Sequence, residues 1–138
     1  MIEVGLTVRD AISSPAGARI WLESIAIRDF RNLERVDLEL PANGIALIGD
    51  NGHGKTNFLE AIYYLQILRS VRETRDVDLT RFDAAGFHIS AIAQSPVEHQ
   101  LAVGFDKGTK RKKVTVDGAN PRRLSDALGA LPSVMFSP

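Results

Sequence analysis

The sequence predicts an α/β fold in which a mixed sheet is joined to an antiparallel β subdomain. The first observation is an apolar stretch at 45–48, directly followed by a glycine-rich loop and by apolar residues at helical spacing. The second is a pair of strand-like stretches at 19–30 and 34–40. The third is a group of three strand-like stretches after residue 86, separated by short turns. A strand–loop–helix segment followed by consecutive short strands is typical of such a composite domain.

The composition is that of a globular chain without disulfides. Of the 138 residues, 44% are hydrophobic, which is enough for a core. The 17 basic residues balance the 17 acidic ones, so net charge gives no argument for a nucleic-acid partner. The sequence has no cysteine, which excludes a thiolate metal site, and no apolar run of the ~18 residues that a membrane span needs. We expect a cytoplasmic chain.

Residues 1–19 differ in character from the rest of the chain. They mix charged and small residues, end in SSPAGAR and lack the continuous apolar run of a signal peptide. We expect them to form a flexible leader, detached from a domain that covers 20–138.

Two strands are expected before the glycine-rich loop, in addition to the one at 19–30. The stretch 34–40 alternates: its apolar residues are Val36, Leu38 and Leu40, and its charged ones are Arg35, Asp37 and Glu39. This period of two predicts one buried and one exposed face. The stretch 45–48 is apolar throughout, which predicts a strand buried on both faces.

A helix is expected from about residue 54 to residue 69. Its apolar residues recur at helical spacing and are Phe58, Leu59, Ile62, Leu65 and Leu68. The polar stretch 70–86 is expected to be irregular.

The second half of the chain predicts an antiparallel meander. Its strands are expected at 87–93, 97–105 and 110–116, because the links QSP and DKGT carry turn residues. Leucines at helical spacing then predict a short helix at 122–131, and 133–136 is expected to be one more strand.

The loop after residue 48 matches the phosphate-binding pattern G-x-x-x-x-G-K-[ST]. The eight residues of this clamp are Gly49, Asp50, Asn51, Gly52, His53, Gly54, Lys55 and Thr56. The glycines let the backbone turn its N–H groups toward phosphate oxygens, and the helix start adds the positive end of its dipole. Lys55 supplies an ammonium for the β- and γ-phosphates, and the Thr56 hydroxyl suits Mg²⁺. The clamp therefore predicts a nucleoside triphosphate site with Lys55 as its catalytic residue.

Hydrolysis also needs an acidic group that holds the magnesium through water. One candidate is Asp106, at the end of the apolar stretch LAVGFD. The alternating pattern of this stretch favours a half-exposed strand, and no second acid follows. We interpret Asp106 as the rim of a hairpin turn, so the catalytic machinery is incomplete in this sequence.

The residues around the clamp resemble the RecF family, DNA replication and repair ATPases on the SMC-like branch of ABC-type ATPases. The motifs that carry the resemblance are Phe30-Arg31-Asn32, Gly49-Asp50-Asn51-Gly52 and the stretch from Asn57 to Ile62, with RSVRETR, RLSDALG and VMFSP further along. The resemblance covers 20–138. In two respects the chain departs from the family: His53 stands where glutamine is usual, and family members are much longer.

The resemblance implies an ABC-type P-loop lobe, the first of two, with ATP and Mg²⁺ as cofactors. Arg31 and Asn57 would join the clamp in binding the nucleotide. The full-length protein would be an ATPase that binds DNA in an ATP-dependent manner, in replication, repair, recombination and the SOS response. Its partners would be DNA of any sequence, a second copy in an ATP-dependent homodimer and other recombination mediator proteins. This chain alone would be inactive, because the acidic strand end and the signature motif are missing.

A cluster of basic residues lies around the expected hairpin tip. Its members are Lys107, Lys110, Arg111, Lys112 and Lys113, with Arg122 and Arg123 nearby in sequence. These side chains are candidates for contacts with DNA phosphates, which carry no sequence information. The alternative is a solvated turn.

Two other functions remain open. A small P-loop kinase or GTPase is disfavoured, because the sequence contains neither an Asn-Lys-x-Asp motif nor a later run of arginines. A truncated remnant that binds nucleotide without turnover is the second alternative. His88 and His99 lie in expected strands without a metal-spaced partner, which favours structural roles.

Overall fold

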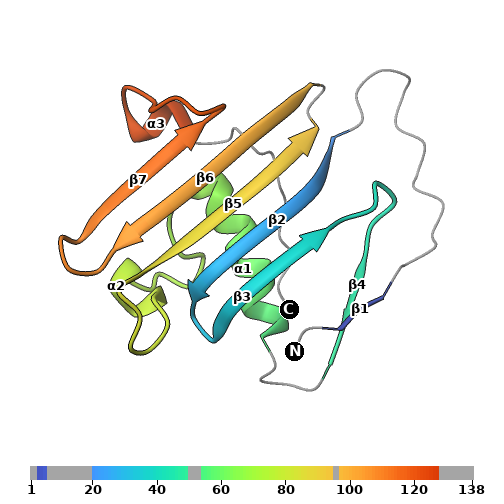
Figure 1. The fold of residues 1–138 in the computed structure, drawn as a ribbon, viewed down its shortest axis with the longest axis horizontal. Helices are drawn as coiled ribbons and strands as arrows, with labels where there is room; N and C mark the ends of the chain where they lie inside the picture. The colour runs from blue at the N-terminus through green and yellow to red at the C-terminus, as the bar shows by residue number, and fades with distance from the viewer. Residues whose placement is uncertain (1–2, 6–19, 50–53, 95–96, 128–138) are drawn as a thin grey trace.

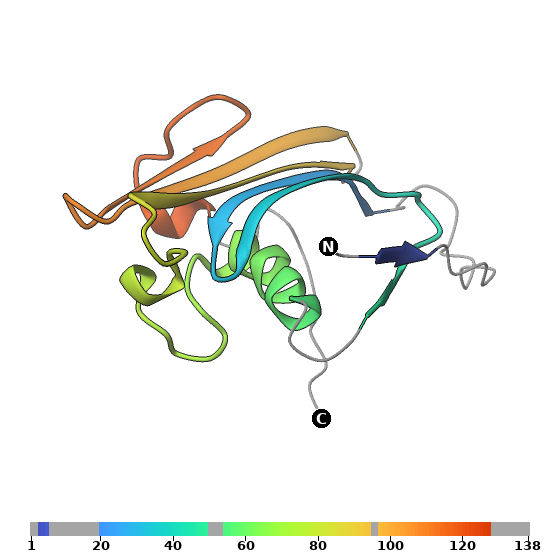
Figure 2. The ribbon, with the colours of Figure 1, turned by 60° about the horizontal axis from the view of Figure 1, so that its bottom comes forward.

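The computed structural model describes residues 3–5, 20–49, 54–94 and 97–127. An antiparallel sheet of five strands forms one layer, and helix α1 (Lys55–Ile67) packs against one of its faces. Figures 1 and 2 show α1 on one side of the sheet, while the opposite side is open.

The sheet has the strand order β3-β2-β5-β6-β7. Its strands are β2 (Trp21–Phe30), β3 (Leu33–Glu39), β5 (Gly86–Gln94), β6 (Glu98–Asp106) and β7 (Arg111–Val116). One row of branched residues crosses all five strands in register: Val36, Ile27, Ile89, Val103 and Val114. Branched side chains at successive cross-strand positions favour this pairing and fix its register.

The meander predicted from the second half of the chain is confirmed, because β5, β6 and β7 pair consecutively. The alternation predicted for 34–40 is also confirmed: its apolar residues are partly buried and its charged residues are exposed. Every pairing among the described residues is antiparallel, so the mixed sheet of the prediction is not seen there.

The core lies between the sheet and α1, whose predicted extent is confirmed to within two residues. Phe58, Ala61 and Tyr64 of the helix are fully buried. The Tyr64 ring meets Phe30 of β2 and Phe87 of β5 edge to face, with centroids 6.1 and 5.5 Å apart. Aromatic pairs in this geometry stabilise the fold by more than the burial of their surface area alone would do.

Strand β4 (Ala46–Ile48) corrects one expectation. It pairs with β1 (Glu3–Gly5) in a separate two-stranded ribbon, and not with a strand of the larger sheet. Ile48 is 58% exposed, because no described element covers that part of the ribbon. The apolar composition of 45–48 therefore did not mean burial on both faces. Three residues of the expected leader take part in this pairing, and the rest of the leader lies outside the described residues.

Two short helices complete the described part of the chain. Helix α2 (Asp76–Leu79) is a single turn inside the stretch 70–86, which was expected to be irregular. Helix α3 (Leu124–Ala127) occupies the start of the helix expected at 122–131. Residues 128–131 and the strand expected at 133–136 lie outside the described residues. No described helix is long and apolar enough to cross a membrane.

Candidate nucleotide-binding site

The described part of the phosphate clamp stands at the start of α1. Gly54 precedes the helix with φ +91°, a left-handed conformation that favours glycine. A Cβ atom there would lie 2.8 Å from Leu33 Cδ2 and 3.0 Å from Asn32 Oδ1. Glycine is therefore required at position 54 for its conformation and for its close approach to the β2–β3 turn. The four clamp residues 50–53 lie outside the described residues.

Lys55 opens α1, and its side chain turns back toward the residue that follows β4. The Lys55 Nζ donates a hydrogen bond to the Gly49 carbonyl, which places the ammonium beside the first residue of the clamp. Thr56 is exposed in the first helical turn. The first N–H groups of a helix have no intrahelical acceptor, so they are available to an anion.

The turn that connects β2 to β3 lies directly beside the clamp. Asn57 Nδ2 donates to Asn32 Oδ1 at 2.7 Å, which ties the first turn of α1 to this turn. Arg31 adopts φ +51°, and its N–H donates to the Leu79 carbonyl at 2.6 Å. The Phe-Arg-Asn motif and the clamp, which lie apart in the sequence, are thus brought together.

Glu60 is a buried carboxylate at the centre of this region, with only 1% of its side chain exposed. Its Oε1 accepts a hydrogen bond from the Arg31 Nε, and its Oε2 accepts one from Ser70 Oγ at 2.8 Å. Arg72 Nη2 lies 3.3 Å from Oε1 and also donates to Asn57 Oδ1 at 2.8 Å. Two arginines and a hydroxyl stabilise a charge that burial would otherwise make costly.

Arg31 was predicted to contact nucleotide phosphates. Its side chain is 20% exposed and is held by Glu60 and by Thr74 Oγ1, 3.0 Å from Nη2. Sequence reasoning missed Glu60 and Arg72. Their signal was an acid among the apolar residues of the helix, next to a loop with several arginines.

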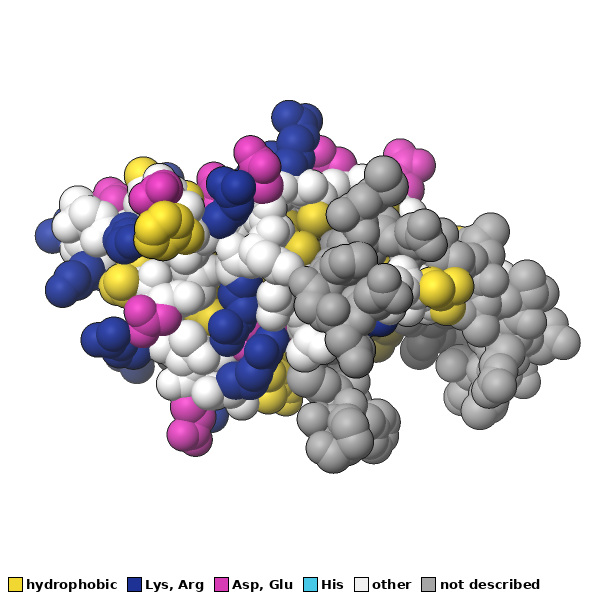
Figure 3. Space-filling view, turned by 90° about the horizontal axis from the view of Figure 1, so that it is seen from below, with side chains coloured by type: hydrophobic (Ala, Val, Ile, Leu, Met, Phe, Trp, Pro, Cys, Tyr) yellow, Lys and Arg dark blue, Asp and Glu magenta, His cyan; other side chains and the backbone are white. Residues whose placement is uncertain are grey.

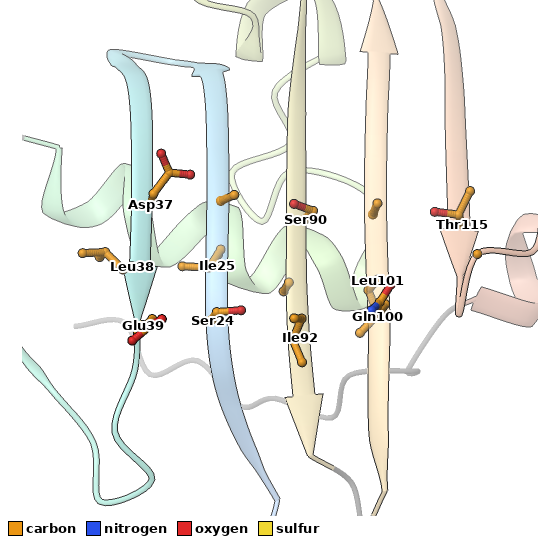
Figure 4. Close-up of a pocket in the computed structure, with 14 residues that line it drawn as sticks. Ser24, Ile25, Asp37, Leu38, Glu39, Ser90, Ile92, Gln100, Leu101 and Thr115 are labelled. Atoms are coloured by element: carbon orange, nitrogen blue, oxygen red, sulfur yellow. The ribbon is translucent and has the colours of Figure 1, made fainter.

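The surface has one hollow beside α1 and another on the open face of the sheet. An apolar groove of about 500 Å³ lies beside the clamp, with Lys55 and Leu59 of α1 and Pro41 in its lining. A larger, shallow hollow of about 610 Å³ crosses the open face of the sheet (Figure 4). Its lining includes Ser24, Ser90 and Thr115 and none of the clamp residues, so the nucleotide prediction concerns the clamp and not this hollow.

The basic cluster divides between the two faces of the sheet. Lys107, Lys110, Arg111 and Lys113 are exposed around the β6–β7 hairpin and along β7. Lys112 lies on the α1 side of the sheet, where its Nζ is 2.9 Å from Asp76 Oδ2 of α2 and its side chain is 16% exposed. Figure 3 shows that Lys and Arg side chains on the face seen from below are interspersed with carboxylates.

The remaining titratable residues have local partners. Asp106 Oδ1 accepts a hydrogen bond from the Gly108 N–H at 2.8 Å, as expected for the rim of a hairpin turn. His99 Nδ1 lies 2.9 Å from Asp117 Oδ2. Burial and the nearby Arg28 hold the pKa of His88 below its usual value. Among the described residues no group of three or more potential ligands could hold a metal ion.

The fold is that of an ABC-type P-loop ATPase lobe. Residues 20–127 match the family described as "Protein of unknown function (DUF2813)", and the chain belongs to this family.

The chain is also similar to curated proteins named DNA replication and repair protein RecF. It is 41% identical over 115 residues to the one from Chlamydia trachomatis serovar L2, covering 83% of this chain and 31% of the relative. It is 38% identical over 117 residues to the one from Halalkalibacterium halodurans, covering 85% and 31%. The chain thus spans about a third of the length of these relatives.

Two solved structures of RecF are also similar to this chain. A structure titled as the recombination mediator protein RecF with ATP in the RecFOR pathway has a TM-score of 0.77 and 28% identity, covering 88% of this chain and 34% of that one. A second, titled RecF-ATPrS, has a TM-score of 0.78, covering 87% and 33%. The resemblance to RecF and the ABC-type P-loop class predicted from the sequence are confirmed.

Proposed function

We propose that the chain is the ATP-binding lobe of a RecF-like protein of DNA replication, repair and recombination. The observation that carries the proposal is the position of Gly54 and Lys55 at the start of α1, against the Asn32 turn. This arrangement supports a role for residues 49–57 in binding the phosphates of ATP, with Thr56 as a magnesium ligand and Lys55 as the catalytic residue. The solved structures named with ATP support ATP as the nucleotide.

Arg31 is proposed to reach a phosphate from the edge of the same site. Its guanidinium is planar and partly exposed beside α1, which suits an anion on the solvent side of Glu60. The role requires only that Arg31 share its donors between Glu60 and the phosphate.

The proposal is tested by measuring the equilibrium binding of Mg-ATP to the purified wild-type protein and to Lys55→Ala. The variant should lose binding while its circular dichroism spectrum stays unchanged, because Lys55 is at the surface end of α1. Lys110→Ala, at the far hairpin, is the control and should bind as the wild type does. Equal affinity for wild type and Lys55→Ala would overturn the assignment.

We further propose that this chain alone hydrolyses ATP negligibly. Asp106, the one acid considered for magnesium, is engaged at a hairpin turn. Transition-state charge in phosphoryl transfer is stabilised by several groups acting together, and an arginine finger alone contributes about 10³–10⁵-fold in rate. Steady-state turnover comparable to that of an intact ATPase would contradict this proposal.

The proposed DNA contacts are the exposed members of the basic cluster: Lys107, Lys110, Arg111 and Lys113. Their charges lie along one edge of the sheet, and phosphate contacts from such residues do not depend on base sequence. Lys112 is turned away from them. ATP-dependent dimerisation, work with other recombination mediators in the SOS response and a cytoplasmic location complete the proposal, all by similarity to RecF.

A further inference from the structure

Lys112 belongs to the basic run in the sequence, but its side chain lies on the other face of the sheet from those of its neighbours. In β7, Arg111 and Lys113 project from the open face of the sheet, whereas Lys112 pairs in register with the buried Phe105 on the α1 side. Among the described residues, neither Arg111 nor Lys113 forms an ion pair, and Lys112 forms one with Asp76. The three neighbours therefore have different surroundings.

The Lys112 ammonium joins three elements of the fold. Its Nζ lies 2.9 Å from Asp76 Oδ2 in α2 and 5.1 Å from the centroid of the Tyr64 ring in α1. It also donates to the carbonyl of Leu68, which caps the C-terminal end of α1. Tyr64 Oη donates to Asp76 Oδ1 at 2.7 Å, which closes the set of contacts. A cation at the C-terminus of a helix is favoured by the helix dipole.

Helix α1 connects this end to the clamp. The helix begins at Lys55, the clamp lysine, and its 13 residues form one uninterrupted segment. At 1.5 Å per residue it spans about 20 Å. A displacement at Leu68 is therefore carried along a rigid element to the site that would hold the nucleotide.

We propose that Lys112 is a positioning residue that couples DNA binding on β7 to nucleotide binding at the clamp. The inference rests on the proposed function. Phosphates that engage Arg111 and Lys113 act on the strand whose next side chain holds the end of α1. The contact then biases the position of α1, and with it Lys55. Coupling of this kind is reciprocal: ATP changes the affinity for DNA by the same factor by which DNA changes the affinity for ATP.

The test measures this factor in the purified protein. Affinity for a fluorescent duplex of arbitrary sequence is determined with and without Mg-ATP, for the wild type and for Lys112→Met. The wild type should bind the duplex about fivefold or more tightly with Mg-ATP. In Lys112→Met the factor should fall below about twofold, because Met keeps the length of the side chain but loses the contacts with Asp76 and Leu68.

Lys113→Met is the matched control, since it removes the same charge one residue further along. It should weaken DNA binding with and without Mg-ATP alike and leave the coupling factor as in the wild type. Asp76→Asn removes the same ion pair from the other side and should reproduce the loss of coupling. It replaces Lys112→Met if that variant fails to fold.

Hydrogen exchange supplies a readout that a purely structural role would not change. In the wild type, the duplex should raise the protection of backbone amides at residues 64–68, and in Lys112→Met it should not. A coupling factor that is unchanged in Lys112→Met and Asp76→Asn would overturn the inference while the proposed function stands. A wild-type factor of one would also overturn the inference, whereas the proposed function is overturned separately, by equal Mg-ATP affinity of the wild type and Lys55→Ala.

Discussion

The arginines around Glu60 and the basic residues along β7 carry the same charge in very different settings. Arg31 and Arg72 are held by one buried carboxylate beside the clamp. Along β7, Arg111 and Lys113 are exposed, and no carboxylate pairs with either in the part of the chain that the structure describes. Cations of the first kind organise the fold, whereas cations of the second kind are available to a polyanion. The two kinds of cation cannot be distinguished by their charge alone, because they differ in whether a carboxylate lies next to them.

Removal of the buried Glu60 carboxylate should destabilise the protein more than any other change considered below. Glu60→Ala leaves Arg31 without its carboxylate and removes the acceptor of Ser70, so the free energy of unfolding should fall by about 3 kcal/mol. Urea denaturation measures the change. Glu39→Gln, an exposed carboxylate on β3, should stay within about 0.5 kcal/mol of the wild type. Similar losses for the two variants would show that Glu60 does not organise this region.

A substitution at Gly54 tests the close contact between the clamp and the turn that contains Asn32. Gly54→Ala should cost about 3 kcal/mol, because the new methyl group meets Leu33 and the backbone is left-handed. Gly118→Ala provides the control: its φ is +79°, but a Cβ there meets nothing within 4 Å. It should cost only about 1–2 kcal/mol of strain. Equal losses in thermal denaturation would mean that the contact with Leu33 carries no energy.

The exposed basic residues around the β6–β7 hairpin and along β7 can be tested by removing their charges. Replacing Lys110, Arg111 and Lys113 with Gln should weaken duplex binding about equally for unrelated sequences. The slope of log affinity against log salt should become shallower by up to about 0.9 for each lost contact. Arg35→Gln is the control, because Arg35 is paired with Asp37, and it should leave the slope unchanged. An unchanged slope in the triple variant would return the cluster to a solvated turn.

The smallest effect concerns pH. Hydrogen bonds from Arg28 and Arg35 lower the pKa of Asp37 below its ordinary value of 3.8. The stability from these contacts is therefore present above pH 3.8 and is lost as pH falls through the lower folded pKa. Asp37→Asn should remove this contribution, so that its acid unfolding curve is less steep below pH 4. Identical curves for wild type and variant would show that the exposed pair contributes nothing.

The local periodicities predicted most of the sheet and α1, because alternation and helical spacing reflect burial directly. The row from Val36 to Val114 is an example. Each of its residues is apolar and lies in a strand that the adjacent residues in the sequence predict. The exposure of Ile48 was not predictable in this way. Its burial depends on which strand lies next to β4, and that information is not contained in residues 45–48.

For the candidate site, the sequence suggests contacts whose chemistry is local and not those that depend on tertiary packing. The spacing of Gly54, Lys55 and Thr56 indicates a phosphate clamp by itself. The pairing of Arg31 with Glu60 joins residues 29 positions apart, and it changes the meaning of both. In the same way, the inward turn of Lys112 follows from the register of β7 with β6, which a run of basic letters does not reveal.

The most direct test of the account is a titration of the isotopically labelled protein with Mg-ATP, followed by amide NMR. We predict saturable shifts that are largest at residues 54–57 and at the Arg31–Asn32 turn, and smaller at Arg111 and Lys113. The same titration of Lys55→Ala should give no saturable shift. The absence of shifts at the clamp, or shifts that are largest along β7, would contradict the assignment of the nucleotide to the clamp.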